Sequence, residues 1–408
     1  MEHNIYKWFE ENYPNHIEKL KNSDHAYDKN TPNPYHLEGD CLTHTKMVFK
    51  EAINLTDKEE ILLAALLHDV GKPKAREVVD DKKRVRFFSH ENYSTAISID
   101  ILIKYKREVN NKLDIVRILE LINWHSDFHN IETNSKLTTK QKELLTKKYK
   151  KDDLFEDMCI LSTADTIGRI IELSRQEQIK SQKEKINFLR NKRKELLNHQ
   201  EEIKKFKYSE DKTKTIKVLI GLPNSGKSTY IKTNKQENEE VLSFDDILLE
   251  EYEGLDYNTA FYKMIEDKKQ EEIEKKFNSK KIETNKLGKN MIIDKTNLSK
   301  KSRRKLLSNL KKFYKKKAIM FIVSRETLEE RNKLRKEQEN KSITEKTYEK
   351  FMKTFTMPDY SEFDEIEYIF EENQLEQKQE QKMKEEKEQK KKNNFSKKKK
   401  KKDNLDNI

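Results

Sequence analysis

The sequence predicts a multidomain protein, with an all-α domain, an α/β domain built on a mostly parallel sheet, and a charged, disordered tail. A length of 408 residues leaves room for two domains of ordinary size. Residues 1–175 carry apolar clusters at helical spacing, whereas the second half alternates short apolar runs with helical segments. The first pattern is typical of a helical domain and the second of βαβ units.

The helical prediction for residues 1–175 rests on clusters such as EEILLAALLHDVGK, AISIDILIKY and IVRILELINWH. Few stretches in this region alternate apolar and polar residues as a half-buried strand does. Residues 176–210 are strongly charged and contain neither proline nor glycine. We therefore expect a helical linker between the two domains.

The α/β prediction for residues 211–372 rests on four short apolar runs. They are IKVLI (216–220), VLSF (241–244), MIID (291–294) and AIMFIV (318–323). Helical segments separate these runs, and strands that alternate with helices predict βαβ units with parallel strands.

Residues 373–408 consist mainly of Lys, Glu, Gln and Asn. They hold 13 lysines and 7 acidic residues, a net charge of +6 out of +12 for the whole chain. Such a segment cannot bury enough apolar surface to offset its ordering entropy, so a disordered basic tail is predicted. The basic balance favours polyanionic partners such as nucleic acid.

Cysteine usage and hydropathy point to a soluble protein of a reducing compartment. Cys41 and Cys159 show no paired or metal-binding spacing, and the N-terminal stretch MEHNIYKWFEENYP lacks the apolar centre of a signal peptide. No uncharged run approaches the ~20 residues that a membrane helix needs. We expect a cytoplasmic protein without a membrane partner.

A phosphate-binding loop follows the first predicted strand. The segment GLPNSGKST (221–229) fits the P-loop pattern and stands between IKVLI and a helix-compatible run, which is the context that the motif requires. Its glycines let the backbone approach phosphates, Lys227 is expected on the β and γ phosphates, and Ser228 on magnesium. The predicted nucleotide-binding residues are Gly221, Asn224, Ser225, Gly226, Lys227, Ser228 and Thr229.

Two adjacent aspartates follow the second predicted strand. Asp245 and Asp246 stand at its carboxyl end, where ligands of open α/β sheets collect. Asp245 is a candidate general base, although the pair could instead cap the next helix.

Residues 216–370 resemble the polynucleotide kinases, including the phage 5′-kinase. The resemblance rests on the P-loop, the Asp-Asp pair, the segment IIDKTNLSKKSRRKLL and a lid that begins ERNKLR. It implies that Asp245 accepts the proton of the attacking 5′-hydroxyl and that Thr296 and Asn297 lie beside the acceptor.

The same resemblance assigns the lid arginines. Arg335 is expected to clamp the transferring phosphate, with Arg331 in support. The chain departs from the phage enzyme at Leu248, where an arginine for the acceptor phosphate is expected, and at the inserted Lys295.

The N-terminal half carries a set of His and Asp residues. His68 and Asp69 end the apolar segment LLAALLHD, where burying two polar groups without partners is costly and a metal ion would satisfy both. Mixed imidazole and carboxylate ligands suit a divalent transition metal, such as Mn, Co, Ni or Fe, that activates water for phosphate-ester hydrolysis. Further candidate ligands are His44, His90, His125 and Asp165.

The order and spacing of this set resemble the HD-domain phosphohydrolases over residues 36–170. Lys72, in the segment HDVGK, strengthens the resemblance and is expected to contact substrate phosphate. The resemblance implies two metal sites, the second of which shares Asp69 with His90 and His125. Asp127 and His129 stay open as alternatives to His125. The implied ligands of the first metal are His44, His68, Asp69 and Asp165.

An HD phosphohydrolase joined to a polynucleotide-kinase-like domain resembles the bifunctional enzymes that heal broken RNA or DNA ends. One module is expected to remove a 2′, 3′ or 2′,3′-cyclic phosphate. The other is expected to install a 5′-phosphate from ATP or another NTP with Mg²⁺, which gives ends that a nucleic-acid ligase can join.

Two other functions stay open at this point. One is a nucleotidase joined to a nucleoside or sugar kinase, since both modules occur in broad superfamilies. The other is an NTP-switched RNA-binding protein, against which the intact HDVGK and GKS segments argue.

Overall fold

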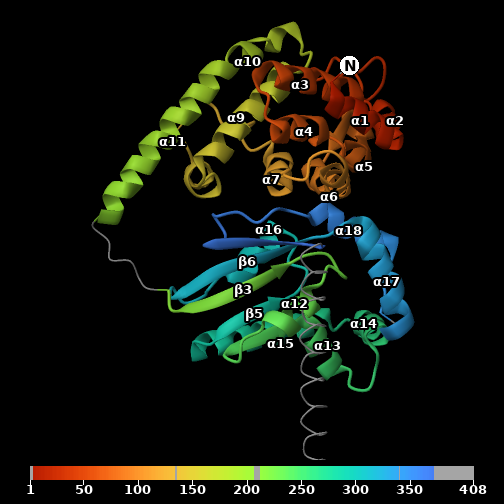
Figure 1. Cartoon of the computed structure of the whole chain (residues 1–408), viewed down its shortest axis with the longest axis vertical. Coiled ribbons are helices and arrows are strands. Elements are labelled where there is room, and N and C mark those ends of the chain that lie inside the picture. The colour runs from red at the N-terminus through yellow and green to blue at the C-terminus, as the bar shows by residue number, and fades with distance from the viewer. Residues whose placement is uncertain (1–2, 134–135, 206–211, 340, 372–408) are drawn as a thin grey trace, which may run out of the picture.

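The computed structural model describes residues 3–133, 136–205, 212–339 and 341–371. They form a helical N-terminal domain and an α/β C-terminal domain, stacked along the long axis of the molecule (Figure 1). The predicted fold class is confirmed for both domains. The tail predicted for residues 373–408 lies outside the described residues. Within the described part of the chain, no helix is long and apolar enough to cross a membrane.

The N-terminal domain is a bundle of helices around the buried helix α4. Every residue from 61 to 67 is buried, because the segment ILLAALL is apolar on all sides and is surrounded by other helices. A small antiparallel hairpin, β1–β2, interrupts the bundle. The helices are α1 (Asn4–Asn12), α2 (Pro14–Lys21), α3 (Cys41–Leu55), α4 (Glu59–Leu67), α5 (Lys72–Ala75), α6 (His90–Glu108), α7 (Ile115–Trp124), α8 (Thr139–Glu143) and α9 (Asp152–Ile167). The remaining elements are β1 (Arg76–Val79), η1 (Asp80–Lys82), β2 (Arg84–Phe87), η2 (Leu144–Lys148) and η3 (Leu173–Arg175).

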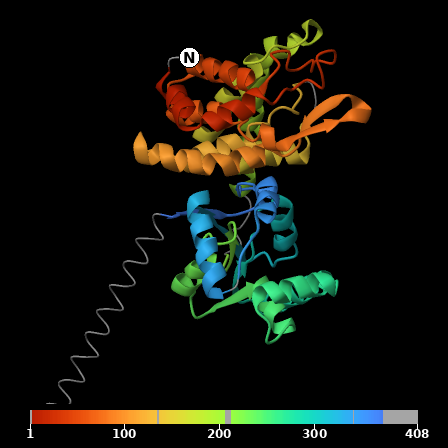
Figure 2. The ribbon, with the colours of Figure 1, turned by 90° about the vertical axis from the view of Figure 1, so that its right-hand side faces the viewer.

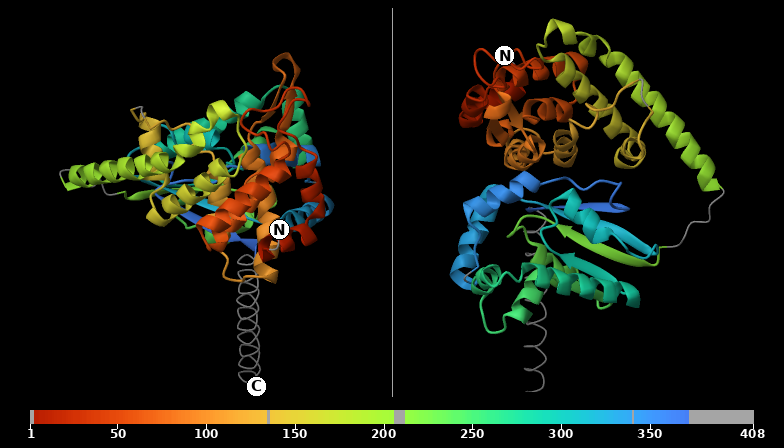
Figure 3. Two further views of the ribbon diagram at one scale, coloured as in Figure 1. Left: turned by 90° about the horizontal axis from the view of Figure 1, so that it is seen from above. Right: turned by 180° about the vertical axis from the view of Figure 1, so that it is seen from behind.

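A long helix leads from this domain toward the second. After the short α10 (Glu177–Lys180), α11 (Gln182–Lys205) runs down the outside of the molecule (Figures 1 and 3). The first half of α11 packs against other parts of the protein. Ile186 and Leu189 are buried, and Arg193 donates a hydrogen bond to the carbonyl of Tyr149 at 2.9 Å. Part of the segment predicted as a linker therefore packs on the N-terminal domain.

The C-terminal domain is a five-stranded sheet in the order β4-β5-β3-β6-β7, and every pair in it is parallel. Its strands are β3 (Lys214–Ile220), β4 (Glu239–Ser243), β5 (Asn290–Asp294), β6 (Tyr314–Ile322) and β7 (Glu365–Phe370). Its helices are α12 (Lys227–Asn234), α13 (Phe244–Glu251), α14 (Tyr257–Glu266), α15 (Gln270–Leu287), α16 (Lys300–Leu307), α17 (Arg325–Glu339) and α18 (Glu345–Thr354).

The central strand β3 explains where the site of this domain forms. Val218 pairs with Ile293 of β5 and with Ala318 of β6, and all three are fully buried. Continuous apolar runs of this kind are typical of parallel sheets that are covered on both faces. Since the strands run in one direction, the loops after β3, β4, β5 and β6 gather at one edge of the sheet.

Helix α6 forms one side of the contact between the two domains (Figure 2). The side chain of Asn92 donates to the carbonyl of Lys353 at 2.8 Å. Asp100 accepts from the backbone N–H of Arg325 at 2.6 Å, so it satisfies an open N–H at the start of helix α17 in the C-terminal domain.

Helix α7 forms the other side of this contact. Asn123 accepts from the backbone N–H of Met357 at 3.1 Å, and the hydroxyl of Tyr368 donates to Glu120 at 3.1 Å. Glu120 is buried between the domains. The domains therefore meet through specific polar contacts, a feature that the sequence did not predict.

Burial raises the pKa of Glu120 from its ordinary value to about 7. Between about pH 4.5 and 7, Glu120 is protonated in the folded protein but ionised in the unfolded chain. The free energy of unfolding therefore decreases as the pH rises through this range, and the decrease is complete above about pH 7. We expect Glu120→Gln to be more stable than wild type at about pH 8, by up to about 3 kcal/mol, and to match it near pH 5. Urea unfolding across this pH range measures the difference, with the surface variant Glu11→Gln as control. Parallel pH profiles for wild type and Glu120→Gln would contradict the assignment.

Candidate active sites

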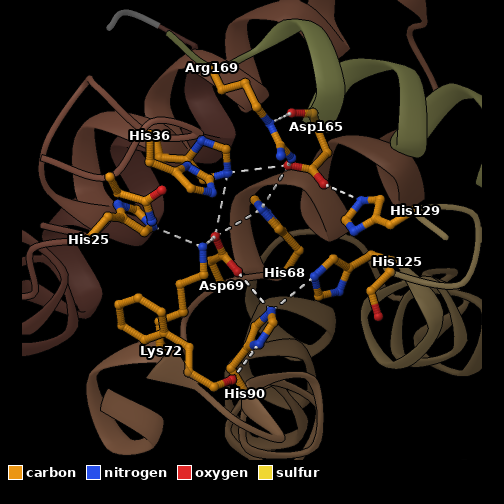
Figure 4. Close-up of a pocket in the computed structure, with 14 residues that line it drawn as sticks. His25, His36, His68, Asp69, Lys72, His90, His125, His129, Asp165 and Arg169 are labelled. Carbon is orange, nitrogen blue, oxygen red and sulfur yellow. Dashed lines mark hydrogen bonds and ion pairs between the residues drawn. The ribbon is translucent and has the colours of Figure 1, made fainter. Parts of the chain in front are cut away.

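The first candidate site is a cavity of about 270 Å³ inside the helical domain (Figure 4). Six helices bring its polar side chains together, because each side chain stands on or beside a helix end or on an inward helix face. His44 comes from α3, His68 and Asp69 follow α4, and His90 begins α6. The set is completed by Lys72 of α5, His125 after α7 and Asp165 of α9.

Three of the imidazole rings are held in the same way. The Nδ1 atoms of His68, His90 and His125 lie 2.8, 2.9 and 2.7 Å from the carbonyls of residues 65, 87 and 122. An Nδ1–H that donates to a carbonyl leaves the lone pair on Nε2 and turns it into the cavity. Histidines that bind metals are usually oriented by this second hydrogen bond.

Asp69 lies between two groups of these rings. Its Oδ2 is 3.2 Å from Nε2 of His68 and 3.5 Å from Nε2 of His44. Its Oδ1 is 3.3 Å from Nε2 of His90, which in turn is 3.2 Å from Nε2 of His125. Each group has its ligand atoms within 4.8 Å of one another. Asp69 can therefore serve both groups, one through each oxygen.

The donor atoms of this site fit a divalent metal. Nε2 of His68 and Oδ1 of Asp69 are buried and have no hydrogen-bond partner among the described residues, and leaving such atoms unsatisfied is costly. Asp165 completes the first group, with Oδ1 3.2 Å from His44 Nε2 and 4.0 Å from His68 Nε2. A cluster of imidazole nitrogens and carboxylate oxygens of this kind suits a divalent transition metal.

Charge balance in the cavity depends on Lys72 and Asp69. Burial alone would raise the pKa of Asp69, but the neighbouring charges of His68 and Lys72 hold it well below its usual range. Burial would also lower the pKa of Lys72, but Asp69, whose Oδ2 lies 2.7 Å from Nζ, raises it. Burial lowers the pKa of His125 to about 3, so its ring is neutral near neutral pH. Since Nδ1 donates to the carbonyl of Ile122, the single proton lies there and Nε2 carries the lone pair.

The structure also settles where the two alternatives to His125 lie. Asp127 accepts from Lys148 at 2.5 Å and from the hydroxyl of Tyr149 at 2.9 Å, and it does not line the cavity. His129 lines the cavity, and its Nε2 lies 3.0 Å from Oδ2 of Asp165. It is His125, therefore, that joins His90 and Asp69.

Sequence reasoning missed four ionisable residues of this cavity region. Arg169 contacts Oδ1 of Asp165 at 2.5 Å, and Glu38 lies 3.1 Å from Nδ1 of His44. His25 and His36 stack at 4.1 Å beside Lys72. Arg169 could have been found, since it stands one helical turn after Asp165. The other three lie in an irregular segment, where spacing carries no signal.

The second candidate site is a pocket of about 500 Å³ at the carboxyl edge of the parallel sheet. The P-loop forms its floor: Gly226 has a φ of +100°, and a Cβ on Gly221 would lie 2.5 Å from the hydroxyl of Ser225. Both positions therefore need glycine. Ser225 itself is buried under the loop. The P-loop residues that line the pocket are Pro223, Asn224, Gly226, Lys227, Ser228 and Thr229.

Lys227 begins helix α12, and its Nζ donates to the carbonyls of Gly221 and Leu222 at 2.9 and 2.8 Å. Burial lowers its pKa to about 8, against the opposing charges of Asp294 and Asp245. Asp294 ends β5 and also lines the pocket, and burial raises its pKa. A carboxylate at the end of the neighbouring strand is a usual partner of the P-loop magnesium, and this aspartate was not singled out from the sequence.

Asp245 lies in the first turn of α13 and lines the same pocket. Nζ of Lys341 lies 2.5 Å from its Oδ2, and the hydroxyl of Tyr257 is hydrogen-bonded to it. Nζ of Lys341 also stands 3.5 Å from the centre of the Tyr257 ring. These two neighbours fix the carboxylate in the pocket.

The predicted lid arginines reach the P-loop from α17. Arg335 donates to the side-chain oxygen of Asn224 at 2.8 Å, and Arg331 donates to its carbonyl at 3.1 Å. Both line the pocket. Two guanidinium groups thus meet the loop on the side that faces the pocket.

The two residues predicted to bind the acceptor differ in whether they reach the pocket. Thr296 lines the pocket, whereas Asn297 is buried and its amide donates to the carbonyl of Leu219 at 2.8 Å. The prediction that Asn297 lies beside the acceptor is therefore not supported, because its side chain holds the end of β3 instead. Leu248, where an arginine was expected, is fully buried.

Comparison with known proteins agrees with this geometry. Residues 41–169 match the HD domain family, and residues 216–358 match an AAA domain family, AAA_33. None of the curated proteins matches the chain significantly.

A matching solved structure is the "Structure of the Pnkp1/Rnl/Hen1 RNA repair complex". One of its chains is 24% identical with a TM-score of 0.30, over 36% of this chain and 46% of that one. The chain thus spans less than half the length of that relative, and the likeness covers only part of each protein.

The fold and the two sites define a fusion of an HD-type helical domain with a P-loop domain of the kinase type. The chain thus joins an HD domain to an AAA-type P-loop domain, which is the arrangement that the resemblance to the HD phosphohydrolase–polynucleotide kinase proteins implies.

Proposed function

We propose that the protein is a bifunctional end-healing enzyme, a 5′-hydroxyl polynucleotide kinase and a metal-dependent 2′,3′-cyclic-phosphate and 2′(3′)-phosphate phosphohydrolase. The observation that carries the proposal is that one chain holds two separate pockets, each lined with groups for phosphate chemistry. The products of the two reactions are the 5′-phosphate and free 3′-hydroxyl that a nucleic-acid ligase requires.

In the kinase pocket, ATP with Mg²⁺ supplies the phosphate. The P-loop N–H groups and Lys227 would hold the β and γ phosphates, and Ser228 would hold the magnesium. Asp245 accepts the proton of the attacking hydroxyl, oriented by Tyr257 and Lys341. Arg335 lies across the P-loop, where it can neutralise charge on the transferring phosphoryl group.

In the helical domain, His44, His68, Asp69 and Asp165 would hold one metal, with His90 and His125 around a second. A bound transition metal, such as Mn, Co, Ni or Fe, supplies a Lewis acid and an activated water at neutral pH. Lys72 and Arg169 put two positive charges in the same cavity, where they can bind the substrate phosphate.

The wall of the kinase pocket favours a nucleic-acid acceptor over a sugar. Tyr257, Phe261 and Tyr262 of α14 line it, with the first two rings stacked at 6.0 Å. Aromatic faces bind nucleobases by stacking without strong sequence preference. RNA or DNA ends are therefore the proposed substrates, and a cytoplasmic location stays a prediction.

The proposal is tested with RNA that carries a 5′-hydroxyl and a 2′,3′-cyclic phosphate, incubated with ATP and a series of divalent metals. We expect 5′ phosphorylation with magnesium and end hydrolysis with manganese, cobalt, nickel or iron. Free nucleosides, sugars and mononucleotides serve as competitors. Faster turnover of these small molecules would instead identify a metabolite enzyme, and binding without turnover would identify an NTP-switched RNA-binding protein.

A further inference from the structure

The β1–β2 hairpin projects from the helical domain (Figure 2), and its last residue, Phe87, lines the candidate metal cavity. Two contacts hold it in place. Arg76 donates to the carbonyl of Asp24 at 3.2 Å, and the hydroxyl of Tyr27 donates to Asp80 at 2.9 Å. The hairpin is thus fixed to the irregular segment that also lines the cavity.

The two faces of the hairpin differ in character. Arg76 pairs with Phe87, and Val79 pairs with Arg84, so side chains alternate between the faces along β2. Phe87 lines the metal cavity, with Nζ of Lys72 5.4 Å from the centre of its ring. Arg84 and Arg86 consequently stand on the opposite face, about 7 Å apart along the strand.

Arg76 is bonded to Asp24, but the other four cations of this hairpin have no such contact within the described part of the protein. No side-chain hydrogen bond or ion pair to a described residue involves Lys82, Lys83, Arg84 or Arg86. Glu77 lies across from Arg86 in the register without forming an ion pair with it. Arginines left free beside a phosphate-processing cavity are suited to bind further phosphates.

Phe88 directly follows the cavity-lining Phe87 and is 72% exposed. It lies between Phe87 and His90, both of which line the cavity, and Ser89 turns the chain with a φ of +63°. Proteins that bind single-stranded nucleic acid use exposed aromatic rings, on which bases stack, together with nearby arginines that contact the phosphate backbone.

We propose that β2 and Phe88 form a binding site for the single-stranded nucleotides that precede the reacting 3′ end. Arg84 and Arg86 bind backbone phosphates, and Phe88 stacks on a base. The inference rests on the proposed phosphohydrolase function and deepens it, because it makes an oligonucleotide and not a mononucleotide the preferred substrate of that site.

The test compares hydrolysis of an RNA of roughly ten nucleotides with a 2′,3′-cyclic end and of a nucleoside 2′,3′-cyclic monophosphate, both by the full-length metal-loaded protein. Phe88→Ala should raise KM for the oligonucleotide about tenfold or more and leave kcat unchanged. Arg84→Gln and Arg86→Gln should also raise this KM, and each should reduce its slope against log salt by about 0.7. None of the three should change KM for the monophosphate.

Matched controls are Lys112→Gln for a lost surface cation and Leu287→Ala for a lost exposed apolar side chain. In each variant, hydrolysis of the monophosphate checks that the helical domain is folded. If wild type hydrolyses both substrates and the hairpin variants leave the oligonucleotide KM unchanged, the binding site is disproved while the proposed function stands. If wild type hydrolyses neither substrate with any metal, the proposed function itself fails.

Discussion

Asp69→Asn should remove the bound metal and the phosphohydrolase activity together, while 5′ phosphorylation continues. Asp69 is the carboxylate that faces both groups of histidines, His44 and His68 on one side and His90 on the other. An asparagine keeps the shape of the side chain but loses the negative charge that offsets the metal and Lys72. We expect a loss of hydrolysis of roughly 10³-fold or more, because no activated water is formed without the metal.

Metal content by mass spectrometry, hydrolysis of a cyclic-phosphate end and kinase activity are measured on the same preparations. Asp127→Asn is the matched control, since Asp127 belongs to the same domain but is bonded to Lys148 and Tyr149 outside the cavity. His125→Ala should lower the metal content and spare the first group. Retention of both metal and hydrolysis by Asp69→Asn would show the HD assignment to be wrong.

The second large effect is expected in the kinase pocket. Lys227→Ala should abolish measurable phosphorylation, because the lysine is the cation that begins α12 within the P-loop. Asp245→Asn should lower kcat by roughly 10² to 10⁴, the usual range for losing a general base. Neither change should affect phosphohydrolysis, since both side chains lie in the other pocket.

Asp246→Asn provides the control for the second prediction. Asp246 is the neighbouring acidic residue of the same helix turn but does not line the pocket. Steady-state rates at saturating ATP, for a 5′-hydroxyl oligonucleotide, compare the variants. Equal rates for Asp245→Asn and Asp246→Asn would mean that Asp245 is not the base; the N-cap of α13 is Ser243.

The fold was predictable from the sequence because its signals are local. The run IKVLI followed by GLPNSGKST predicts a strand, a loop and a helix, and the described elements β3 and α12 lie there. The candidate metal set was also predictable, since helix ends and inward helix faces bring widely spaced His and Asp residues to one point. Both results depend on regular elements, in which residue spacing translates directly into position.

The features of the second pocket that the sequence did not reveal depend on contacts between segments that are distant in the chain. Asn297 follows Thr296 directly, yet only Thr296 lines the pocket. The side-chain amide of Asn297 instead donates a hydrogen bond to the carbonyl of Leu219 in the central strand. Asp294 gains its significance from Lys227, which belongs to a different strand-to-helix connection. No spacing rule within one segment reveals either relation.

Two helices of the N-terminal domain, α6 and α7, connect the candidate metal site with the contact between the domains. Helices α6 and α7 lead to His90 and His125 at one end, and their side chains Asp100 and Asn123 hold Arg325 and Met357 of the other domain. The two halves therefore carry matching surfaces, and we expect them to recognise each other even without the peptide connection. A gene divided between the codons for Lys205 and Lys212 would still encode two complementary subunits. In that view, the fusion acts chiefly as a tether that raises the effective concentration of each half for the other.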